Sequence, residues 1–166
     1  MKRYKYPILF ITFGLVYVFL EVFYHSIVGD LTPQWKYLSF IGYTSLWVFP
    51  IGAICGVILG MLNELKHVKD IRPSFQCIIG TILVLIIEYF SGYMLNMKLG
   101  LNIWDYSFLP LQINGQISLL FALLWFCIAP LALWLDEFIK WVVFDEVAEY
   151  KNLFKLYKQV FTFKKN

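Results

Sequence analysis

The chain has 166 residues, of which 60% are hydrophobic and 15% are charged, and it carries a net charge of +3. Soluble domains have about 25% charged residues, so this composition excludes an ordinary soluble domain and is typical of a membrane protein. We interpret the positive charge as a sign of orientation and of contact with anionic lipid, and we expect no nucleic-acid partner.

Four apolar segments are long enough to cross a bilayer. A spanning helix needs about 20 mostly apolar residues, which segments 7–28, 42–62, 74–95 and 116–138 provide. The first is longer than a typical signal-peptide core and carries Glu21 and His25, so we expect a true span. The sequence predicts an all-α integral membrane protein with four transmembrane helices in residues 1–138.

Basic residues concentrate on one side of the predicted membrane. The N-terminus, the loop after the second span and the tail carry 12 of the 14 basic residues, namely Lys2, Arg3, Lys5, Lys66, Lys69, Arg72, Lys140, Lys151, Lys155, Lys158, Lys164 and Lys165. The other two loops carry only Lys36 and Lys98. Because cytoplasmic loops are enriched in lysine and arginine, both termini are predicted to be cytoplasmic.

Two glutamates interrupt the apolar segments. Glu21 and Glu88 each lie about two thirds of the way along a predicted span, where a charge is costly and often marks a functional site. Together they would form a paired-carboxylate site for a proton, a cation or a cationic solute. Alternatively, each would accept a hydrogen bond from a serine, tyrosine or tryptophan and so hold the helices together.

The two halves of the chain resemble each other. Glu21, Gly42, Ser45 and the run 62–64 recur in order as Glu88, Gly115, Ser118 and the run 135–137. This pattern predicts two parallel-repeat hairpins, at about 7–64 and 74–137, related by an axis along the membrane normal. Such an axis would bring Ser45 and Ser118 near the depth of the two glutamates, in the outer half of the bilayer.

His25 follows Glu21 by four residues and shares its helix face. With Glu88 and Asp105, these two side chains would make a carboxylate-rich metal site with one imidazole. The alternative is an uncoordinated histidine near the membrane interface. A metal ion is the only cofactor that the sequence raises, and none is predicted firmly.

The loop between the third and fourth spans carries a second group of candidates. Pro110 and Gly115 predict that residues 98–115 are not one continuous helix, and that the loop folds back over the outer mouth of the bundle. Asp105 would either cap the following turn or contact a solute, together with Trp104 and Tyr106. Asn114 and Gln116 would either cap the fourth span or line the site. Pro50 and Pro130 are predicted to kink the second and fourth spans.

The remaining features lie on the cytoplasmic side. Glu64 and Glu137 end the second and fourth spans, where a negative charge at a helix C-terminus is unfavourable. Each therefore needs a basic neighbour such as Lys66 or Lys140, or takes part in partner docking. The tail, residues 139–166, has apolar residues at helical spacing from Val143 to Phe161, which predicts a basic amphipathic helix on the membrane surface or a docking helix.

Several motifs resemble a known family of small membrane proteins. They are the runs Glu88-Tyr89-Phe90-Ser91-Gly92, Trp104-Asp105-Tyr106-Ser107 and Asn114-Gly115-Gln116-Ile117-Ser118-Leu119, with Trp125, Glu21 and the run Gly42-Tyr43-Thr44-Ser45-Leu46-Trp47 upstream. Over residues 10–138 the chain resembles the ABC-transporter permeases of the CmpB type. It departs from the family's usual Pro-Ile-Tyr-Gly, where it has Pro50-Ile51-Gly52-Ala53. It also departs from the usual Pro-Phe-Asn before the glycine, where it has Pro110-Leu111-Gln112-Ile113-Asn114. The resemblance implies that Glu21, Glu88, Trp104, Asp105 and Tyr106 form the distinctive part of the fold.

Three function classes follow. The first is a permease-like subunit that works with a separate ATPase subunit or by ion coupling, since the chain has no phosphate-binding loop of its own. The second is a non-catalytic membrane scaffold or regulatory subunit. The third is a small intramembrane enzyme or metal-binding protein. Because four spans enclose little volume, a transport path would need a homodimer or another partner in the bilayer.

Overall fold

The computed structural model describes residues 2–28, 44–69 and 71–163. A 3-10 turn at Lys2–Tyr4 leads into α1 (Lys5–Val28), which is followed by α2 (Val48–Lys69) and α3 (Pro73–Gly92). A π-helix (Tyr93–Lys98) extends α3, and a short hairpin of β1 (Gln112–Ile113) and β2 (Ile117–Ser118) precedes α4 (Leu119–Phe144) and α5 (Leu153–Thr162). The repeat positions Gly42 and Tyr43 and the loop lysine Lys36 lie outside the described residues.

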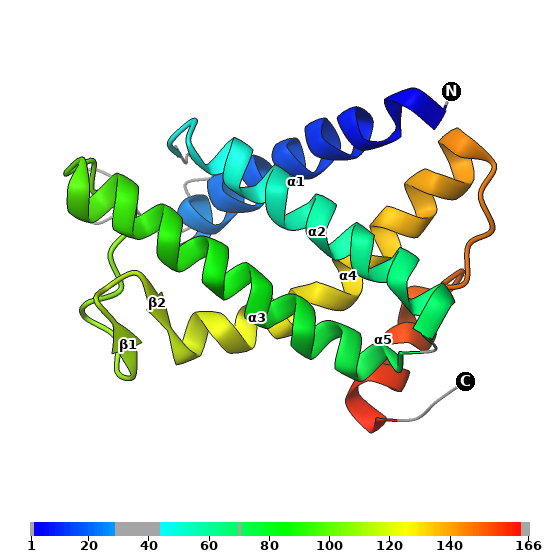
Figure 1. The fold of residues 1–166 in the computed structure, drawn as a ribbon. Coiled ribbons are helices and arrows are strands. Elements are labelled where there is room, and N and C mark those ends of the chain that lie inside the picture. Colours follow the sequence, from blue (N-terminus) through cyan, green and yellow to red (C-terminus); the bar gives the residue numbers. More distant parts are fainter. Residues whose placement is uncertain (1, 29–43, 70, 164–166) are drawn as a thin grey trace.

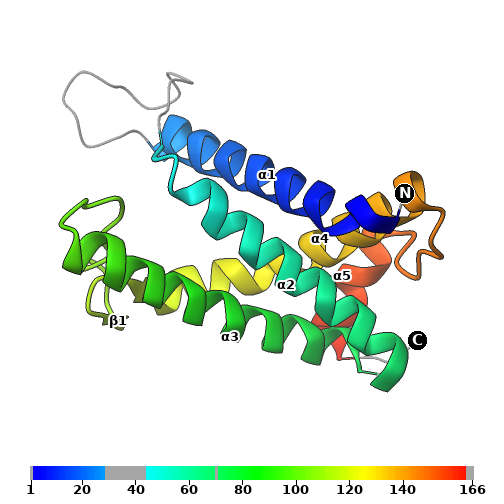
Figure 2. The same ribbon diagram turned by 45° about the horizontal axis from the view of Figure 1, so that its top comes forward.

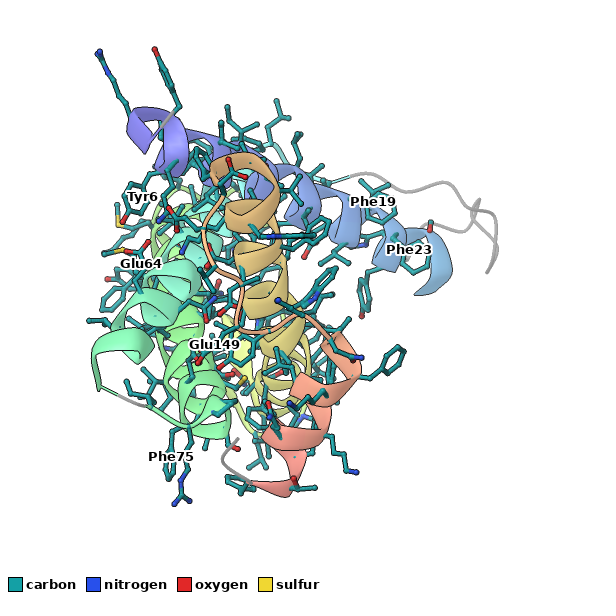
Figure 3. All side chains as sticks on the ribbon, turned by 90° about the vertical axis from the view of Figure 1, so that its right-hand side faces the viewer. Tyr6, Phe19, Phe23, Glu64, Phe75 and Glu149 are labelled. Atoms are coloured by element: carbon teal, nitrogen blue, oxygen red, sulfur yellow. The ribbon has the colours of Figure 1, made fainter. Side chains whose placement is uncertain are left out.

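Four helices in the described part of the chain are long and apolar enough to cross a membrane, at Lys5–Ser26, Val48–Leu65, Pro73–Lys98 and Leu119–Phe144. They run alternately in opposite directions (Figures 1 and 2). Large apolar side chains cover the outside of the bundle, among them Phe19, Phe23 and Phe75 (Figure 3). An apolar exterior suits a bilayer as solvent, so the chain is a multi-pass membrane protein and the predicted all-α fold is confirmed.

The bundle has two distinct ends. The start of α1 and the helix α5 lie at one end, which we call the tail end (Figures 1 and 2). The π-helix and the β-hairpin lie at the other, which we call the loop end. Helix α2 packs against α1, α3 and α4.

Glycines let α1 and α2 approach closely. The position that a Cβ would take on Gly52 is occupied by the Tyr17 side chain, and that on Gly56 by the Phe13 side chain. In lipid the hydrophobic effect does not drive helices together. Small residues at a crossing let the two backbones come close, and the resulting van der Waals packing stabilises the pair. The pairing of α1 with α2 therefore depends on this four-residue glycine spacing.

The two prolines differ in their effect. Pro50 is the third residue of α2, where a missing N–H breaks no helical hydrogen bond, so the predicted kink in the second span is wrong. Pro130 lies inside α4, and Figure 1 shows this helix bending along its course. A mid-helix proline removes one backbone bond and clashes with the preceding turn, which accounts for the bend.

The predicted C-terminal amphipathic helix is confirmed as α5, but the tail before it is not helical throughout. Helix α4 continues to Phe144, Asp145 takes a left-handed conformation, and α5 begins only at Leu153. The side chains that bury α5 against α3 and α4 are Leu156 and Val160, whereas Phe154 of the predicted stripe is 84% exposed. The C-terminal amphipathic helix exists, but it is shorter and turned relative to the prediction.

Candidate functional site

The Glu88 carboxylate is buried where three elements meet. Its side chain is 4% exposed on α3. Glu88 Oε2 accepts a hydrogen bond from the Trp125 indole N–H of α4 at 2.9 Å, and Oε1 accepts one from the Tyr106 hydroxyl at 3.2 Å. No basic side chain of the described residues forms an ion pair with it. The carboxylate is thus held by two neutral donors.

Aromatic rings support both donors. Trp125 is stacked on Tyr17 of α1, with ring centroids 5.5 Å apart and planes within 5°. Tyr106 is stacked on Phe121 of α4, with centroids 4.2 Å apart. Burial raises the pKa of the Tyr106 hydroxyl, and the Glu88 and Glu21 carboxylates raise it further. The phenol therefore stays protonated at neutral pH and remains a donor.

The π-helix positions the loop that carries Tyr106. Asn96 donates to the Trp104 carbonyl at 3.0 Å and to Gln116 Oε1 at 2.8 Å, and its own Oδ1 accepts from the Ile103 N–H at 2.7 Å. The Trp104 indole N–H donates to the Gln116 carbonyl at 3.1 Å. A single buried amide thus ties the loop to α3, although no sequence pattern pointed to Asn96.

The loop returns to the bundle through a tight hairpin. Asn114 and Gly115 both have positive φ, of 51° and 69°, as a type I′ turn requires. The Asn114 amide donates to the Tyr89 hydroxyl at 2.9 Å, and the Tyr106 N–H donates to the Gly115 carbonyl at 2.8 Å. Asn114 therefore forms the turn, whereas the cap of α4 is Ser118, whose hydroxyl accepts from the Phe121 N–H at 3.4 Å.

Asp105 and Ser45 have local partners. The Asp105 carboxylate accepts from the N–H and the hydroxyl of Ser107 at 2.8 and 2.9 Å, which is the turn-capping alternative. Ser45 accepts from the Trp47 N–H at 3.3 Å just before α2. Neither side chain has a hydrogen bond to Glu88 among the described residues.

Glu21 lies near this cluster with a partner of its own. Its Oε2 lies 3.5 Å from His25 Nε2 one turn along α1, and the Glu21 side chain is 30% exposed. No hydrogen bond joins Glu21 to Glu88 within the described ranges. Nor do those ranges contain a group of three metal-ligating side chains. The structure thus brings Glu21 and His25 together, but it does not assemble the predicted four-residue metal site.

A second polar cluster lies at the tail end. Lys140 Nζ lies 2.8 Å from Asp136 Oδ2 and 3.2 Å from Glu64 Oε1, and Asp136 is 0% exposed. Asn63 donates to Asp136 Oδ2 at 3.0 Å. Lys5 of α1 adds ion pairs to Glu64 and Glu146, each at 2.9 Å. We call these six residues the tail-end network.

The tail-end network gives the helix-terminal glutamates partners inside the chain. Glu64 meets Lys140, one of the predicted basic neighbours, and also the Tyr6 hydroxyl at 3.1 Å (Figure 3). Glu137 is buried and accepts from the Tyr150 N–H at 2.6 Å. Docking of a partner on Glu137 would therefore require this region to open. Asp136 and Lys140 were not predicted as a pair, although residues four apart on a helix lie on the same face.

A mostly apolar cavity of about 120 Å³ lies inside the bundle, on the tail-end side of Trp125. All four spanning helices line it. Side chains that reach it include Phe13 and Tyr17 of α1, Thr81 of α3, and Trp125 of α4. The Thr81 hydroxyl is buried without a hydrogen-bond partner. The same indole that holds Glu88 thus forms part of the cavity wall.

Residues 8–163 match the family described as "Putative ABC-transporter type IV", of the CmpB type. The chain belongs to this family. No curated protein and no solved structure matches it. The chain thus combines four helices that are long and apolar enough to cross a membrane with membership of an ABC-transporter family. The expected resemblance is confirmed and extends through α5.

Proposed function

We propose that the chain is a permease-like subunit in which Glu88 binds a proton, a cation or a cationic solute. The observation that carries this proposal is the Glu88 carboxylate itself. It is buried in a spanning helix, it has no basic partner among the described residues, and its hydrogen-bond donor Trp125 lines the cavity. A charge in this position is costly, and such residues usually serve ion or substrate pathways.

Because both donors are neutral, a cation can replace them at the Glu88 carboxylate. A cation arriving at Glu88 competes with hydrogen bonds from Tyr106 and Trp125, and with no ion-paired base in the described part of the chain. Replacing a neutral donor costs less than displacing a buried ion pair, because no second charge is left unpaired. Glu21 also lies toward the loop end, and it would supply a second carboxylate for a cation that reaches Glu88 from that end.

The tail-end network supports a closed state of such a path. Lys140 of α4 pairs with Glu64 of α2, and Lys5 of α1 pairs with the same glutamate. These ion pairs lie at the opposite end of the bundle from Glu88. In a permease that opens alternately to the two sides, this network is the part that has to separate for release.

We propose that both termini are cytoplasmic, as the distribution of basic residues predicts. The tail end then faces the cytoplasm, where a separate ATPase subunit would dock near α5. The exposed lysines Lys151, Lys155 and Lys158 would contact that subunit or the headgroups of anionic lipids. A homodimer would complete a path that four spans alone enclose poorly.

The experiment compares Glu88→Gln with Glu149→Gln, a matched change at an exposed tail-end site. The tagged chain is purified from native membranes, co-purified subunits are assayed for ATP hydrolysis, and the solute content of the cells is profiled. We expect an ATPase subunit to co-purify with all variants, and Glu88→Gln alone to change the solute profile at least fivefold. An unchanged profile, with Glu88→Gln present at the wild-type level, would refute the transport role of Glu88.

One observation favours a second candidate, a non-transporting scaffold. Both oxygens of Glu88 already accept hydrogen bonds, which suits a structural lock between α3, α4 and the loop. A scaffold predicts that Glu88→Gln lowers the thermal stability or the yield of the assembled complex and leaves every solute level unchanged. The solute profile and a melting curve from the same preparations therefore separate the two functions.

A further inference from the structure

Helices α1 and α4 border two hollows that follow one another along the bundle. The first is the central cavity of about 120 Å³. The second is an open groove of about 350 Å³ toward the loop end, lined by Tyr24, Leu120, Phe121, Leu123, Leu124 and Cys127. Leu20 lines the cavity and Tyr24 the groove, one turn apart on α1, and Leu124 and Ile128 stand in the same relation on α4. We call this pair of hollows the α1–α4 seam.

The seam has the length of one lipid leaflet. On α1 it runs from Phe13 to Tyr24, which at 1.5 Å per residue is about 16 Å. The hydrocarbon core of a bilayer is about 30 Å thick, so the seam covers about half of it. Tyr24 lies near the loop end of its span, and Phe13 near the middle. The seam thus extends from one membrane surface toward the bilayer centre.

The lining selects an apolar occupant. Among the residues that the structure describes, no charged side chain lines either hollow, and most lining residues are aliphatic or aromatic. The groove opens onto the outside of the bundle, where Leu123 and Leu124 are exposed. An apolar hollow of this size stays dry and takes hydrocarbon in preference to water. A helix of a second copy, about 10 Å across, is too thick for the inner hollow.

We propose that the α1–α4 seam binds one acyl chain of a phospholipid from the leaflet at the loop end. The acyl chain enters from the bilayer through the groove, between Tyr24 and Leu124. Its methyl end lies in the central cavity against Tyr17 and Trp125. The bilayer that surrounds the bundle supplies this occupant at the groove. Because Trp125 also holds Glu88, the acyl chain contacts the residue that positions the buried carboxylate. Binding of lipid here does not depend on transport through Glu88.

The test uses a phosphatidylcholine with a photoreactive diazirine near the end of one acyl chain. The purified full-length chain is reconstituted with this lipid and illuminated, and the labelled residues are mapped by mass spectrometry. We expect labelling at the seam, on Val16, Leu20 and Ile128, to exceed that on the exposed α3 face by at least fivefold. The exposed comparison residues are Ile82, Ile86 and Phe90.

Two tryptophan substitutions fill the seam, and a third places tryptophan outside it as a control. Ile128→Trp and Leu124→Trp place an indole in the inner and outer hollow, and each should reduce labelling on α1 at least fivefold. Ile86→Trp puts the same side chain on the exposed α3 face and should leave seam labelling unchanged. Leu124 lies at the surface, so its substitution keeps the test valid if Ile128→Trp fails to fold.

Three results would overturn the proposal. They are equal labelling of the seam and the α3 face, undiminished seam labelling in Leu124→Trp, and labelling on α1 that falls as much in Ile86→Trp as in the seam variants. The Glu88→Gln variant separates this inference from the transport role. It should keep full seam labelling, whether or not it changes any solute level.

Discussion

The Glu88 carboxylate depends on single hydrogen-bond donors that mutation removes cleanly. In Trp125→Phe, Glu88 Oε2 loses the indole N–H that lies 2.9 Å away. A buried acceptor left without its donor costs about 1–3 kcal/mol. We expect Trp125→Phe to lower the unfolding free energy by this amount in detergent. Trp141→Phe, at an exposed position of α4, should change it by less than about 0.5 kcal/mol. Equal losses in the two variants would contradict the assigned bond.

Tyr106 predicts a specific alkaline sensitivity. Burial and the two carboxylates raise its pKa in the folded protein, while a tyrosine in the unfolded chain has a pKa of about 10. The group's contribution to stability is therefore complete below about pH 10, and is lost as the pH rises toward the higher folded pKa. Tyr106→Phe should show a shallower fall of melting temperature above pH 10. Tyr4→Phe, at an exposed tyrosine, should keep the wild-type slope, and a wild-type slope in Tyr106→Phe would refute the prediction.

For individual residues, the sequence predicted Glu88 itself better than it predicted the residues that bind Glu88. The cost of a charge in hydrocarbon points directly to Glu88, and the loop motif points to Tyr106. The contact with Trp125 depends on how α3 and α4 rotate and cross, which one sequence does not specify. Asn96 could not be predicted for the same reason. Its amide binds the loop only once the loop has folded back against the π-helix.

Among the elements, the β-hairpin offers the sharpest test, because Gly115 and Gly100 make a matched pair. Both have positive φ, of 69° and 67°, so alanine at either position costs about 1–2 kcal/mol of backbone strain. A Cβ on Gly115 would also lie 2.6 Å from Asp105 Oδ1, whereas one on Gly100 meets nothing within 4 Å.

Gly115→Ala should therefore lower the unfolding free energy by more than Gly100→Ala does, in thermal or denaturant unfolding of the purified protein. It should also disturb the bond between the Tyr106 N–H and the Gly115 carbonyl, and so the approach of Tyr106 to Glu88. Equal destabilisation by the two variants would mean that contact with Asp105 contributes nothing.

The elements also show where pattern reasoning fails. Hydropathy located all four spans, because length and apolar content decide insertion into a bilayer. The hairpin was missed although Asn114-Gly115 is a strong type I′ signal, since the apolar residues around it were assigned to the fourth span. The helical spacing of the tail predicted the amphipathic helix that α5 forms, but it contains no sign of the turn at Asp145.

For the whole molecule, the tail-end network joins α1, α2 and α4 through buried and half-buried charges at one end. Lys140→Met leaves Asp136 buried without a counter-charge, which costs about 3–5 kcal/mol. Adding Asp136→Asn removes the charge but keeps an acceptor for Asn63, so the double variant should recover most of the loss. Thermal unfolding of the four-member cycle measures this coupling. The exposed Lys155→Met serves as control, and additive effects of the two substitutions would contradict the network.

The duplicated hairpin stays a prediction, and one contact supports it. Asn63 and Asp136 occupy corresponding positions in the two halves, and they are hydrogen-bonded at 3.0 Å. Corresponding residues that touch lie close to the axis relating the halves. The two glutamates are less symmetric, because Glu88 is buried and Glu21 is 30% exposed beside His25. A shared ancestry of the halves therefore leaves room for different roles of these carboxylates.

The reactivity of Glu88 toward a hydrophobic carbodiimide, which modifies protonated carboxylic acids within the bilayer, tests the central claim most directly. Labelling of Glu88 in reconstituted membranes is quantified by mass spectrometry over a series of pH values, with Glu88→Gln as blank. If Glu88 exchanges protons or cations with solution, its labelling falls as the pH rises and as a competing cation is added. A Glu88 that stays unlabelled, or whose labelling ignores both pH and cations, would show a locked structural carboxylate and contradict the permease account.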